Sequence, residues 1–222
     1  MSGRALLLIG SPRREESTSA RLGDRLLSGL TARGFAGETR QLLPAWDSSE
    51  RMAEVLTVAA AADLLLLSVP LYADHLPAPV IRFLERYAEQ RPPGSRPQRM
   101  AALVHCGFPE ATRNLPALDT LRLFCARRGI GFSGALAMGM GGALGGRRHF
   151  PGGGRARKQP LLAIDRAAEA LAAGEAIPAE CERQAGRPLM ARWLYLLGGN
   201  WGWKRRALRL GIRARLYDRP YA

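Results

Sequence analysis

Three continuous apolar runs along the chain each predict a strand that is buried on both faces. Residues 5–9 form the first run, residues 63–69 contain four consecutive leucines, and residues 100–106 form the third. Unbroken apolar sequence is typical of central strands in a parallel sheet, because helices cover both faces of such a sheet. Weaker strand patterns cover residues 35–43, which we expect towards an edge, and residues 133–138.

Segments with the apolar spacing of amphipathic helices separate these strands. Residues 19–33 carry leucines at positions 22, 26, 27 and 30, on one helix face. Further helices are expected at residues 49–61, 115–128 and 158–173, with another beginning near residue 80. This alternation predicts an α/β fold, a doubly wound five-stranded parallel sheet with helices on both faces. In the strand order 2-1-3-4-5, the first and third strands are neighbours, and ligands bind where their carboxyl ends meet.

The loop after the first strand has the composition of an anion site. Gly10-Ser11-Pro12-Arg13 ends the strand, and Ser17-Thr18-Ser19 opens the next helix. Hydroxyls and backbone N–H groups at a helix N-terminus can converge on a phosphate. A plain turn with a serine N-cap is the alternative. Neither G-x-G-x-x-G nor a P-loop motif is present here, so the cradle suits a single phosphate, although Glu15 and Glu16 would repel one.

Two further loops follow the next central strands. Residues 70–79 hold three prolines together with Tyr72 and His75, and residues 107–110 read Gly-Phe-Pro-Glu. Prolines fix the first loop, and the second predicts a tight turn with an aromatic side chain at its tip. Both loops leave the same edge of the sheet as the phosphate corner. The alternative for the proline-rich loop is a rigid connector without a ligand.

Charge and aromatic residues concentrate in the C-terminal part of the chain. The formal net charge is +14, and residues 187–222 contain nine arginines or lysines and one acid, Asp218. We expect one domain over residues 1–177 and a basic, aromatic, helical extension over residues 178–222. Residues 188–217 suit contact with an anionic membrane surface. The alternative is that their aromatic side chains pack back on the domain or across a dimer.

The remaining composition narrows the chemistry and the location. The three cysteines form no C-x-x-C motif, so zinc, iron–sulfur and disulfide sites have no support, and no metal is expected. No run of eighteen apolar residues occurs, and the chain enters a strand without a charged leader, so we expect a soluble cytoplasmic protein. Nucleic acid is not an expected partner, because the basic residues are joined to no reading motif. Redox chemistry would therefore need an organic cofactor.

The motifs of these loops, in their order and spacing, resemble those of the flavodoxin-like NAD(P)H-dependent oxidoreductases, the FMN reductase and multimeric flavodoxin group. The resemblance extends to the tail, where Gly199 to Trp203 and the ending at Tyr217 to Tyr221 have counterparts. It implies that FMN is bound non-covalently. The implied phosphate contacts are Ser11, Arg13, Ser17, Thr18 and Ser19. The implied contacts of the isoalloxazine ring are Pro70, Leu71, Tyr72, His75, Gly107 and Phe108.

The resemblance also implies the reaction. A hydride would pass from NAD(P)H to the flavin, and the electrons would then pass to a small acceptor such as a quinone or another oxidised aromatic compound. No side chain is required as a catalytic acid or base, although His75 is a candidate proton donor. Sites of this group often lie at a dimer interface, which implies a homodimer.

Two other functions are compatible with parts of the sequence. A non-enzymatic flavodoxin-like electron carrier, or a redox adaptor at a membrane surface, would need FMN but no space for nicotinamide. A phosphatase is suggested by His105-Cys106 followed by Arg113, which is similar to an H-C-x5-R loop. Six residues separate Cys106 from Arg113, however, and Pro109 lacks an N–H donor.

Overall fold

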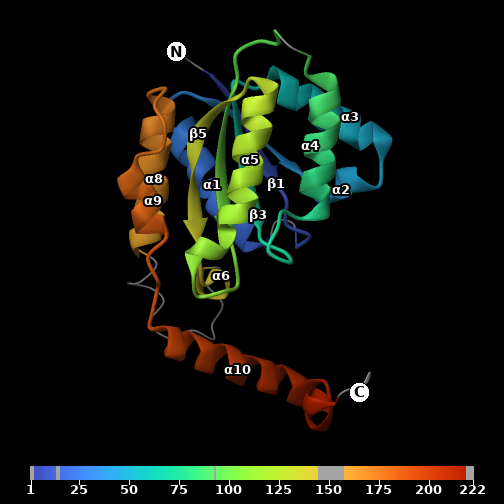
Figure 1. The fold of residues 1–222 in the computed structure, drawn as a ribbon, viewed down its shortest axis with the longest axis vertical. Helices are drawn as coiled ribbons and strands as arrows, with labels where there is room; N and C mark the ends of the chain where they lie inside the picture. Colours follow the sequence, from blue (N-terminus) through green and yellow to red (C-terminus); the bar gives the residue numbers. More distant parts are fainter. Residues whose placement is uncertain (1–2, 14–15, 93, 145–157, 219–222) are drawn as a thin grey trace.

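A five-stranded parallel sheet forms the centre of the computed structural model, which describes residues 3–13, 16–92, 94–144 and 158–218. The strand order is β2-β1-β3-β4-β5, as predicted. The strands are β1 (Arg4–Ile9), β2 (Ala36–Gln41), β3 (Leu64–Pro70), β4 (Arg99–His105) and β5 (Gly131–Met138). The apolar runs of β1, β3 and β4 are almost wholly buried, because helices lie on both faces of the sheet (Figure 1). The fold is flavodoxin-like.

Alternate residues of the central strands enter two separate hydrophobic cores. Leu6, Leu8 and Leu65 belong to one core, whereas Leu7 and Leu66 belong to the other. The first core is covered by α3 (Ser49–Ala61), α4 (Ala78–Gln90) and α5 (Leu115–Arg128). The second is covered by α1 (Thr18–Thr31), α8 (Lys158–Ala172) and α9 (Ala179–Ala185). The period of two along each strand thus supplies both faces of the sheet with leucine side chains.

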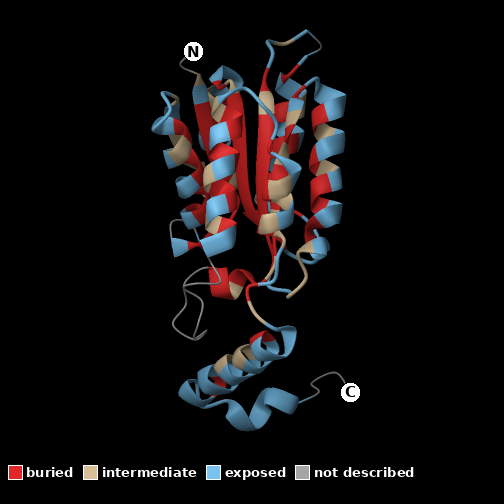
Figure 2. Cartoon of the chain, turned by 90° about the vertical axis from the view of Figure 1, so that its left-hand side faces the viewer, coloured by how far each residue is buried: buried red, intermediate tan, exposed pale blue. Residues whose placement is uncertain are grey.

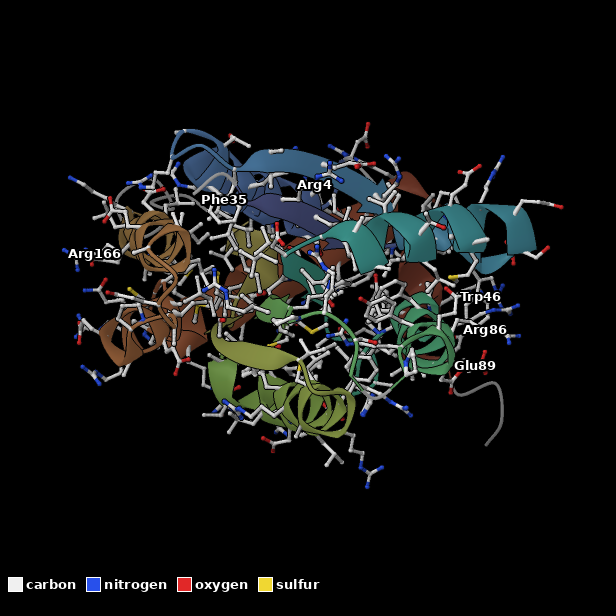
Figure 3. All side chains as sticks on the ribbon, turned by 90° about the horizontal axis from the view of Figure 1, so that it is seen from above. Arg4, Phe35, Trp46, Arg86, Glu89 and Arg166 are labelled. Atoms are coloured by element: carbon white, nitrogen blue, oxygen red, sulfur yellow. The ribbon has the colours of Figure 1, made fainter. Side chains whose placement is uncertain are left out.

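Charged side chains lie at the outer surface of these layers. In the view along the strands, Arg86 and Glu89 lie together on α4, and Arg166 extends from α8 (Figure 3). The Arg86 and Glu89 side chains are separated by 3.0 Å. At the amino end of the sheet, the backbone N–H of Arg4 and the guanidinium of Arg96 both bond Asp63, and these bonds hold the pKa of its carboxyl below the ordinary value.

Short helices depart from the elements predicted from the sequence. Leu42–Trp46 forms α2, where the pattern predicted that the preceding strand continued to residue 43. Leu42 and Ala45 are buried in the first core, so tertiary packing and not periodicity defines this five-residue helix. Gly141–Leu144 forms α6, within the glycine-rich stretch for which no helix was predicted. Residues 145–157 of that stretch lie outside the described residues.

The C-terminal extension divides into a packed part and a projecting part. Helix α9 contacts α8 and β5 and completes the second layer. Helix α10 (Arg192–Arg209) and the 3-10 helix η3 (Arg213–Tyr217) lie beyond the carboxyl ends of the strands, away from the sheet (Figures 1 and 2). The predicted division into a domain up to residue 177 and an extension from residue 178 stays a prediction. Among the described residues, no helix combines the length and apolar character needed to cross a bilayer.

Candidate functional site

Three loops meet at the carboxyl edge of the sheet. They follow β1, β3 and β4, which are adjacent in the sheet and end in register, since Ile9 pairs with Ser68 and Pro70 pairs with His105. The described parts of the loops are residues 10–13 with 16–17, residues 71–77 and residues 106–110, and helix α10 passes below them (Figure 1). The structure thus brings the three sequence-predicted loops to one edge.

The first loop turns tightly against α4. A Cβ on Gly10 would lie 2.3 Å from Cγ2 of Val80 and 2.7 Å from Cγ1 of Val69, so this position has space only for glycine. Ser11 is buried, and its hydroxyl accepts a 3.4 Å hydrogen bond from the backbone N–H of Arg13. Arg13 itself is exposed. The loop therefore combines an exposed cation, Arg13, with a buried hydroxyl, that of Ser11.

The three hydroxyl residues at the start of α1 have different roles. Ser17 is the N-cap, and its hydroxyl oxygen accepts from the N–H of Ala20 at 3.0 Å. A serine hydroxyl that accepts in this way still has one O–H group to donate. Thr18 donates to the carbonyl of Gly141 at 3.4 Å, and Ser19 Oγ lies 2.9 Å from Nε2 of His105. The hydroxyls of Thr18 and Ser19 thus join the helix to α6 and β4, whereas Ser17, which is also buried, caps the amino end of the helix.

The buried His105 lies directly behind this loop. Burial, and to a smaller extent the positive charge of Arg13, lower the pKa of its imidazole to about 4. His105 is therefore neutral at neutral pH, and the positive charge of the corner comes from Arg13 and the amino end of α1. No sequence pattern indicates the pairing of His105 with Ser19, apart from the position of His105 at the last residue of β4.

The second loop is a two-residue hairpin at the end of β3. Tyr72 and His75 exchange two backbone hydrogen bonds of 2.9 Å, and both intervening residues have positive φ, 47° at Ala73 and 59° at Asp74. This pattern is that of a type I′ turn, which holds the loop rigid. Leu71 extends the strand, since its N–H donates to the carbonyl of His105 at 2.8 Å. The Tyr72 ring is 45% exposed at the tip of this rigid support.

His75 is directed towards α5. Its Nε2 lies 3.1 Å from Oγ1 of Thr120, on the exposed side of that helix. The N–H groups of Leu71, Tyr72 and His75 are all bonded within the protein, so their donors are already in use. The prediction that this loop contacts a flavin ring stays a prediction, and the part available for it is the exposed Tyr72 side chain.

The third loop is held by its neighbours. The N–H groups of Met140 and Gly141 donate to the carbonyls of Phe108 and Cys106, each at 2.7 Å. The hydroxyl of Tyr195, in the first turn of α10, donates to the carbonyl of Gly107 at 2.9 Å. The Phe108 ring is 47% exposed, with the guanidinium of Arg113 5.5 Å from its centroid. The tip of the loop after β4 therefore carries an exposed aromatic side chain, as the sequence predicted.

Glycines let the turn after β5 approach the third loop. A Cβ on Gly139 would lie 2.4 Å from the carbonyl oxygen of Pro109. A Cβ on Gly141 would lie 2.9 Å from both the carbonyl oxygen of Cys106 and Nδ1 of His105. This stretch lacks a dinucleotide motif, and its glycines serve close backbone packing around the site. Together with Tyr195, it is a contributor to the edge that sequence analysis missed.

The cysteine at the third loop lacks the properties of a nucleophile. Cys106 is buried, and burial raises the pKa of its thiol above the ordinary value. Its Sγ is 3.5 Å from the carbonyl of Glu110 and 3.8 Å from that of Phe108, in donor geometry. A thiol that donates to carbonyls, with Arg113 engaged on an aromatic ring, does not form a phosphatase cradle.

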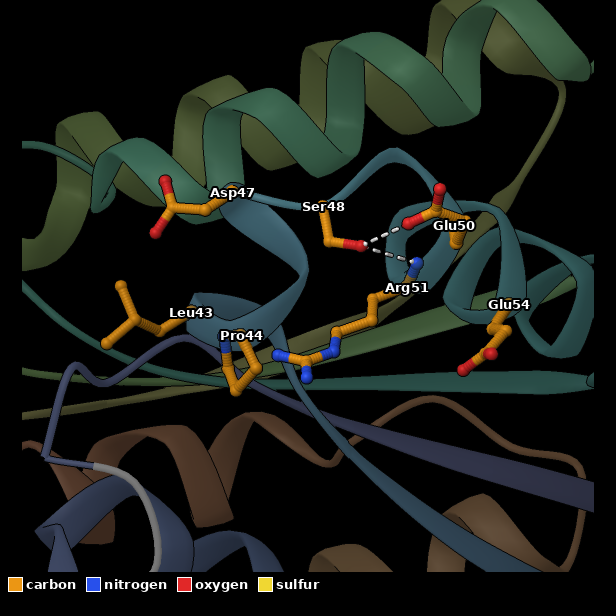
Figure 4. A pocket seen from close by; sticks show the side chains of 7 residues that line it. All are labelled: Leu43, Pro44, Asp47, Ser48, Glu50, Arg51 and Glu54. Atoms are coloured by element: carbon orange, nitrogen blue, oxygen red, sulfur yellow. Dashed lines mark hydrogen bonds between the residues drawn. The ribbon is translucent and has the colours of Figure 1, made fainter.

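A surface hollow lies outside this edge, between α2 and the beginning of α3 (Figure 4). The hydroxyl of Ser48 there bonds the N–H of Arg51 at 3.2 Å and a carboxylate oxygen of Glu50 at 3.0 Å. Three carboxylates outweigh one guanidinium, so the hollow does not suit a phosphate. The residues that line it are Leu43, Pro44, Asp47, Ser48, Glu50, Arg51 and Glu54.

Comparisons with known proteins place this architecture in its fold class. An NAD(P)H:quinone oxidoreductase from Methanothermobacter marburgensis superposes with a TM-score of 0.57 and 18% identity, over 77% of this chain and 96% of that one. An FMN-dependent NADH-azoreductase from Bacillus anthracis, solved in complex with FMN, superposes with a TM-score of 0.57 and 13% identity, over 76% of this chain and 99% of that one. An NADH:FMN oxidoreductase in its apo form superposes with a TM-score of 0.58 and 18% identity, over 82% of this chain and 94% of that one.

These similarities show a shared flavodoxin-like fold. Each of the three neighbours is covered almost in full, whereas this chain is longer than the shared part. No protein-family model matches the chain, and no curated protein sequence matches it.

Proposed function

We propose that this chain binds FMN at the carboxyl edge of its sheet and acts as an NAD(P)H-dependent oxidoreductase. The observation that carries the proposal is the convergence there of a helix N-terminus, an adjacent arginine and two exposed aromatic side chains, Tyr72 and Phe108, on the loops of neighbouring strands. An anion site beside flat apolar surfaces suits a cofactor with a charged tail and a planar ring system. The neighbouring structures are those of an NAD(P)H:quinone oxidoreductase, an FMN-dependent NADH-azoreductase and an NADH:FMN oxidoreductase, which supports the same class.

The phosphate of FMN would be held at the amino end of α1. Arg13 supplies a full positive charge, Ser11 an enclosed hydroxyl, and Ser17 a hydroxyl hydrogen. Thr18 and Ser19 would contribute through the backbone of the first helical turn, since their hydroxyls are bonded to Gly141 and His105. The described Glu16 is exposed, so its carboxylate can remain in solvent. The residues present therefore fit the group.

The ring system would lie against the second and third loops. In our proposal its direct contacts are the exposed Tyr72, His75, Gly107 and Phe108. The buried Pro70 and Leu71 would support the loop behind them. The type I′ turn and the bonds from Met140 and Tyr195 hold these loops before any ligand arrives. Such preorganisation reduces the entropy lost on binding.

Bound FMN would supply the redox chemistry, by accepting a hydride from NAD(P)H and passing electrons to a small acceptor, quinone-like or another oxidised aromatic compound. The chain would supply orientation and electrostatics. No side chain is assigned as acid or base, because His105 is buried and neutral, and His75 is bonded to Thr120. Exposed Tyr72 and Phe108 would shield the ring from water on two sides.

Anaerobic rapid mixing of the FMN-loaded protein with NADH or NADPH tests the activity. We expect the visible absorption band of the bound flavin to bleach in a reaction whose rate saturates with the nicotinamide concentration. Free FMN at the same concentration is the control. A protein that retains FMN but shows no bleaching above this control would be an electron carrier, and the enzymatic proposal would fail.

We further propose that the protein forms a homodimer in the cytoplasm. The support is the exposure of Tyr72 and Phe108 at the edge, since aromatic residues are enriched at protein interfaces. Light scattering of the purified protein, with and without FMN, gives its molar mass directly. The mass of a single chain in both samples would remove the dimer from the proposal.

A further inference from the structure

Helix α10 is a projecting element that is fastened at one end. The hydroxyl of Tyr195 bonds the carbonyl of Gly107, and the guanidinium of Arg192 lies 3.3 Å from Glu110. Beyond this first turn the helix runs below the carboxyl edge of the sheet, and most of its residues are exposed (Figures 1 and 2). The attachment fixes the position of α10 while it leaves most of the helix surface uncovered.

The uncovered surface of α10 is strongly apolar. Trp193, Leu197 and Trp201 follow one another at intervals of four residues and therefore share a face of the helix. Their exposed fractions are 69%, 60% and 52%, and Leu208 continues this face at 58%. Trp203, at 66%, is also exposed but lies on a different side of the helix. Large apolar side chains exposed together along one helix indicate an interaction surface.

The same segment carries a high positive charge. Residues 187–217 contain eight arginines or lysines and no acidic residue. Arg206 and Arg209 lie away from this face. Lys204 lies within it and Arg205 borders it, with the Arg205 guanidinium 5.0 Å from the centroid of the Trp201 ring. An exposed helix that combines tryptophan and leucine with several cations suits the plane of a membrane surface, because long cationic side chains beside the apolar groups can extend to the lipid headgroups.

We propose that α10 binds the surface of a bilayer that contains anionic lipids. Its tryptophans and leucines would enter the boundary between headgroups and acyl chains, and its cations would pair with lipid phosphates. Charge complementarity favours this occupant over a second copy of the chain, because the formal net charge of each copy is +14. Nucleic acid would match the arginines but would leave the leucines in water.

The attachment of α10 gives the bound protein an orientation. Because Tyr195 and Arg192 connect the helix to the loop of residues 107–110, the carboxyl edge of the sheet would face the bilayer. An apolar acceptor dissolved in the lipid could then approach that edge directly. This consequence rests on the proposed function, whereas the binding of α10 to lipid does not.

Tryptophan fluorescence provides the test, because three of the four tryptophans lie in α10 and only Trp46 lies elsewhere. The full chain is titrated with vesicles of phosphatidylcholine, either pure or mixed in equal parts with phosphatidylglycerol. Binding is confirmed by sedimentation with the vesicles. We expect a blue shift and co-sedimentation with the anionic vesicles, and much weaker binding to the neutral ones. The assay needs no flavin, so it is independent of the FMN proposal.

Two charge-matched variants make the test specific. The triple variant Arg205→Gln, Arg206→Gln, Arg209→Gln removes three cations from α10, and glutamine preserves helix propensity. At about fivefold per cation, its partitioning onto anionic vesicles should fall on the order of 100-fold. The control variant Arg51→Gln, Arg127→Gln, Arg128→Gln removes three exposed arginines from the domain and should change binding little.

A second variant tests the contribution of the apolar side chains of α10. Leu197→Gln with Leu208→Gln leaves every tryptophan reporter in place and should weaken binding roughly tenfold or more. Three results would overturn the proposal. They are no binding of the parent chain to anionic vesicles, equal loss in the two triple variants, or a stable dimer whose tryptophan emission does not respond to lipid. The last result would assign α10 to a second copy of the chain.

Discussion

The buried imidazole of His105 makes the stability of the protein depend on pH. Its pKa is about 4 in the folded chain and 6.5 when it is free of the fold, so below pH 6.5 the unfolded chain binds a proton that the folded chain does not. The stability that this difference provides is complete above about pH 6.5 and is lost as the pH falls towards 4. At 1.36 kcal/mol per pKa unit the full loss is about 3 kcal/mol, of which about 2 kcal/mol is lost by pH 5.

The variant His105→Gln isolates this effect. A glutamine amide can still bond the Ser19 hydroxyl but does not titrate, so the variant should be less stable than the parent at about pH 8. The difference should shrink by about 2 kcal/mol by about pH 5. Urea unfolding at several pH values measures it, and the Ser19→Ala variant serves as a control that retains the imidazole. Parallel stability curves for parent and His105→Gln would refute the assignment of a buried, neutral His105.

Three further substitutions test the corner after β1. Gly10→Ala should lower the free energy of unfolding by about 1–3 kcal/mol, because the new Cβ would overlap Val80. Gly107→Ala, which has open space around it, should change the free energy of unfolding by no more than about 0.5 kcal/mol. Urea unfolding compares the two variants. Arg13→Gln should weaken FMN binding roughly tenfold and raise the pKa of His105. Flavin titration and NMR of the imidazole measure these effects, and unchanged values would remove Arg13 from the site. Ser17→Ala should cost about 1 kcal/mol through loss of the N-cap, so equal stability in thermal unfolding would contradict that role.

The sequence predicted the sheet well because its central strands are buried on both faces. The short, continuous apolar runs of β1 and β3 are typical of buried strands, and both form strands. Helix α5 has the predicted bounds of Leu115–Arg128. Prediction failed at the sheet edge. The apolar residues after β2 are compatible with a longer strand or with a helix, and burial of Leu42 against α3 and α4 selects the helix.

The sequence predicted which loops form the candidate site, but not the side-chain contacts that hold these loops in place. Adjacent parallel strands deliver their following loops to one edge, so the gathering of the three loops follows from strand order alone. The contacts of Ser19 with His105 and of Tyr195 with Gly107 join residues that are 86 and 88 positions apart. Local patterns carry no information about such pairs. They depend on how α1 and α10 pack against the edge.

Binding of FMN is the central claim, and equilibrium titration of the purified protein with FMN tests it most directly. Flavin fluorescence reports the bound fraction, and dialysis followed by an absorption spectrum reports what is retained. The account predicts saturable binding with one FMN per chain, weakened by Arg13→Gln and unaffected by removal of the three α10 arginines. A titration without saturation, and a colourless protein after dialysis, would contradict it.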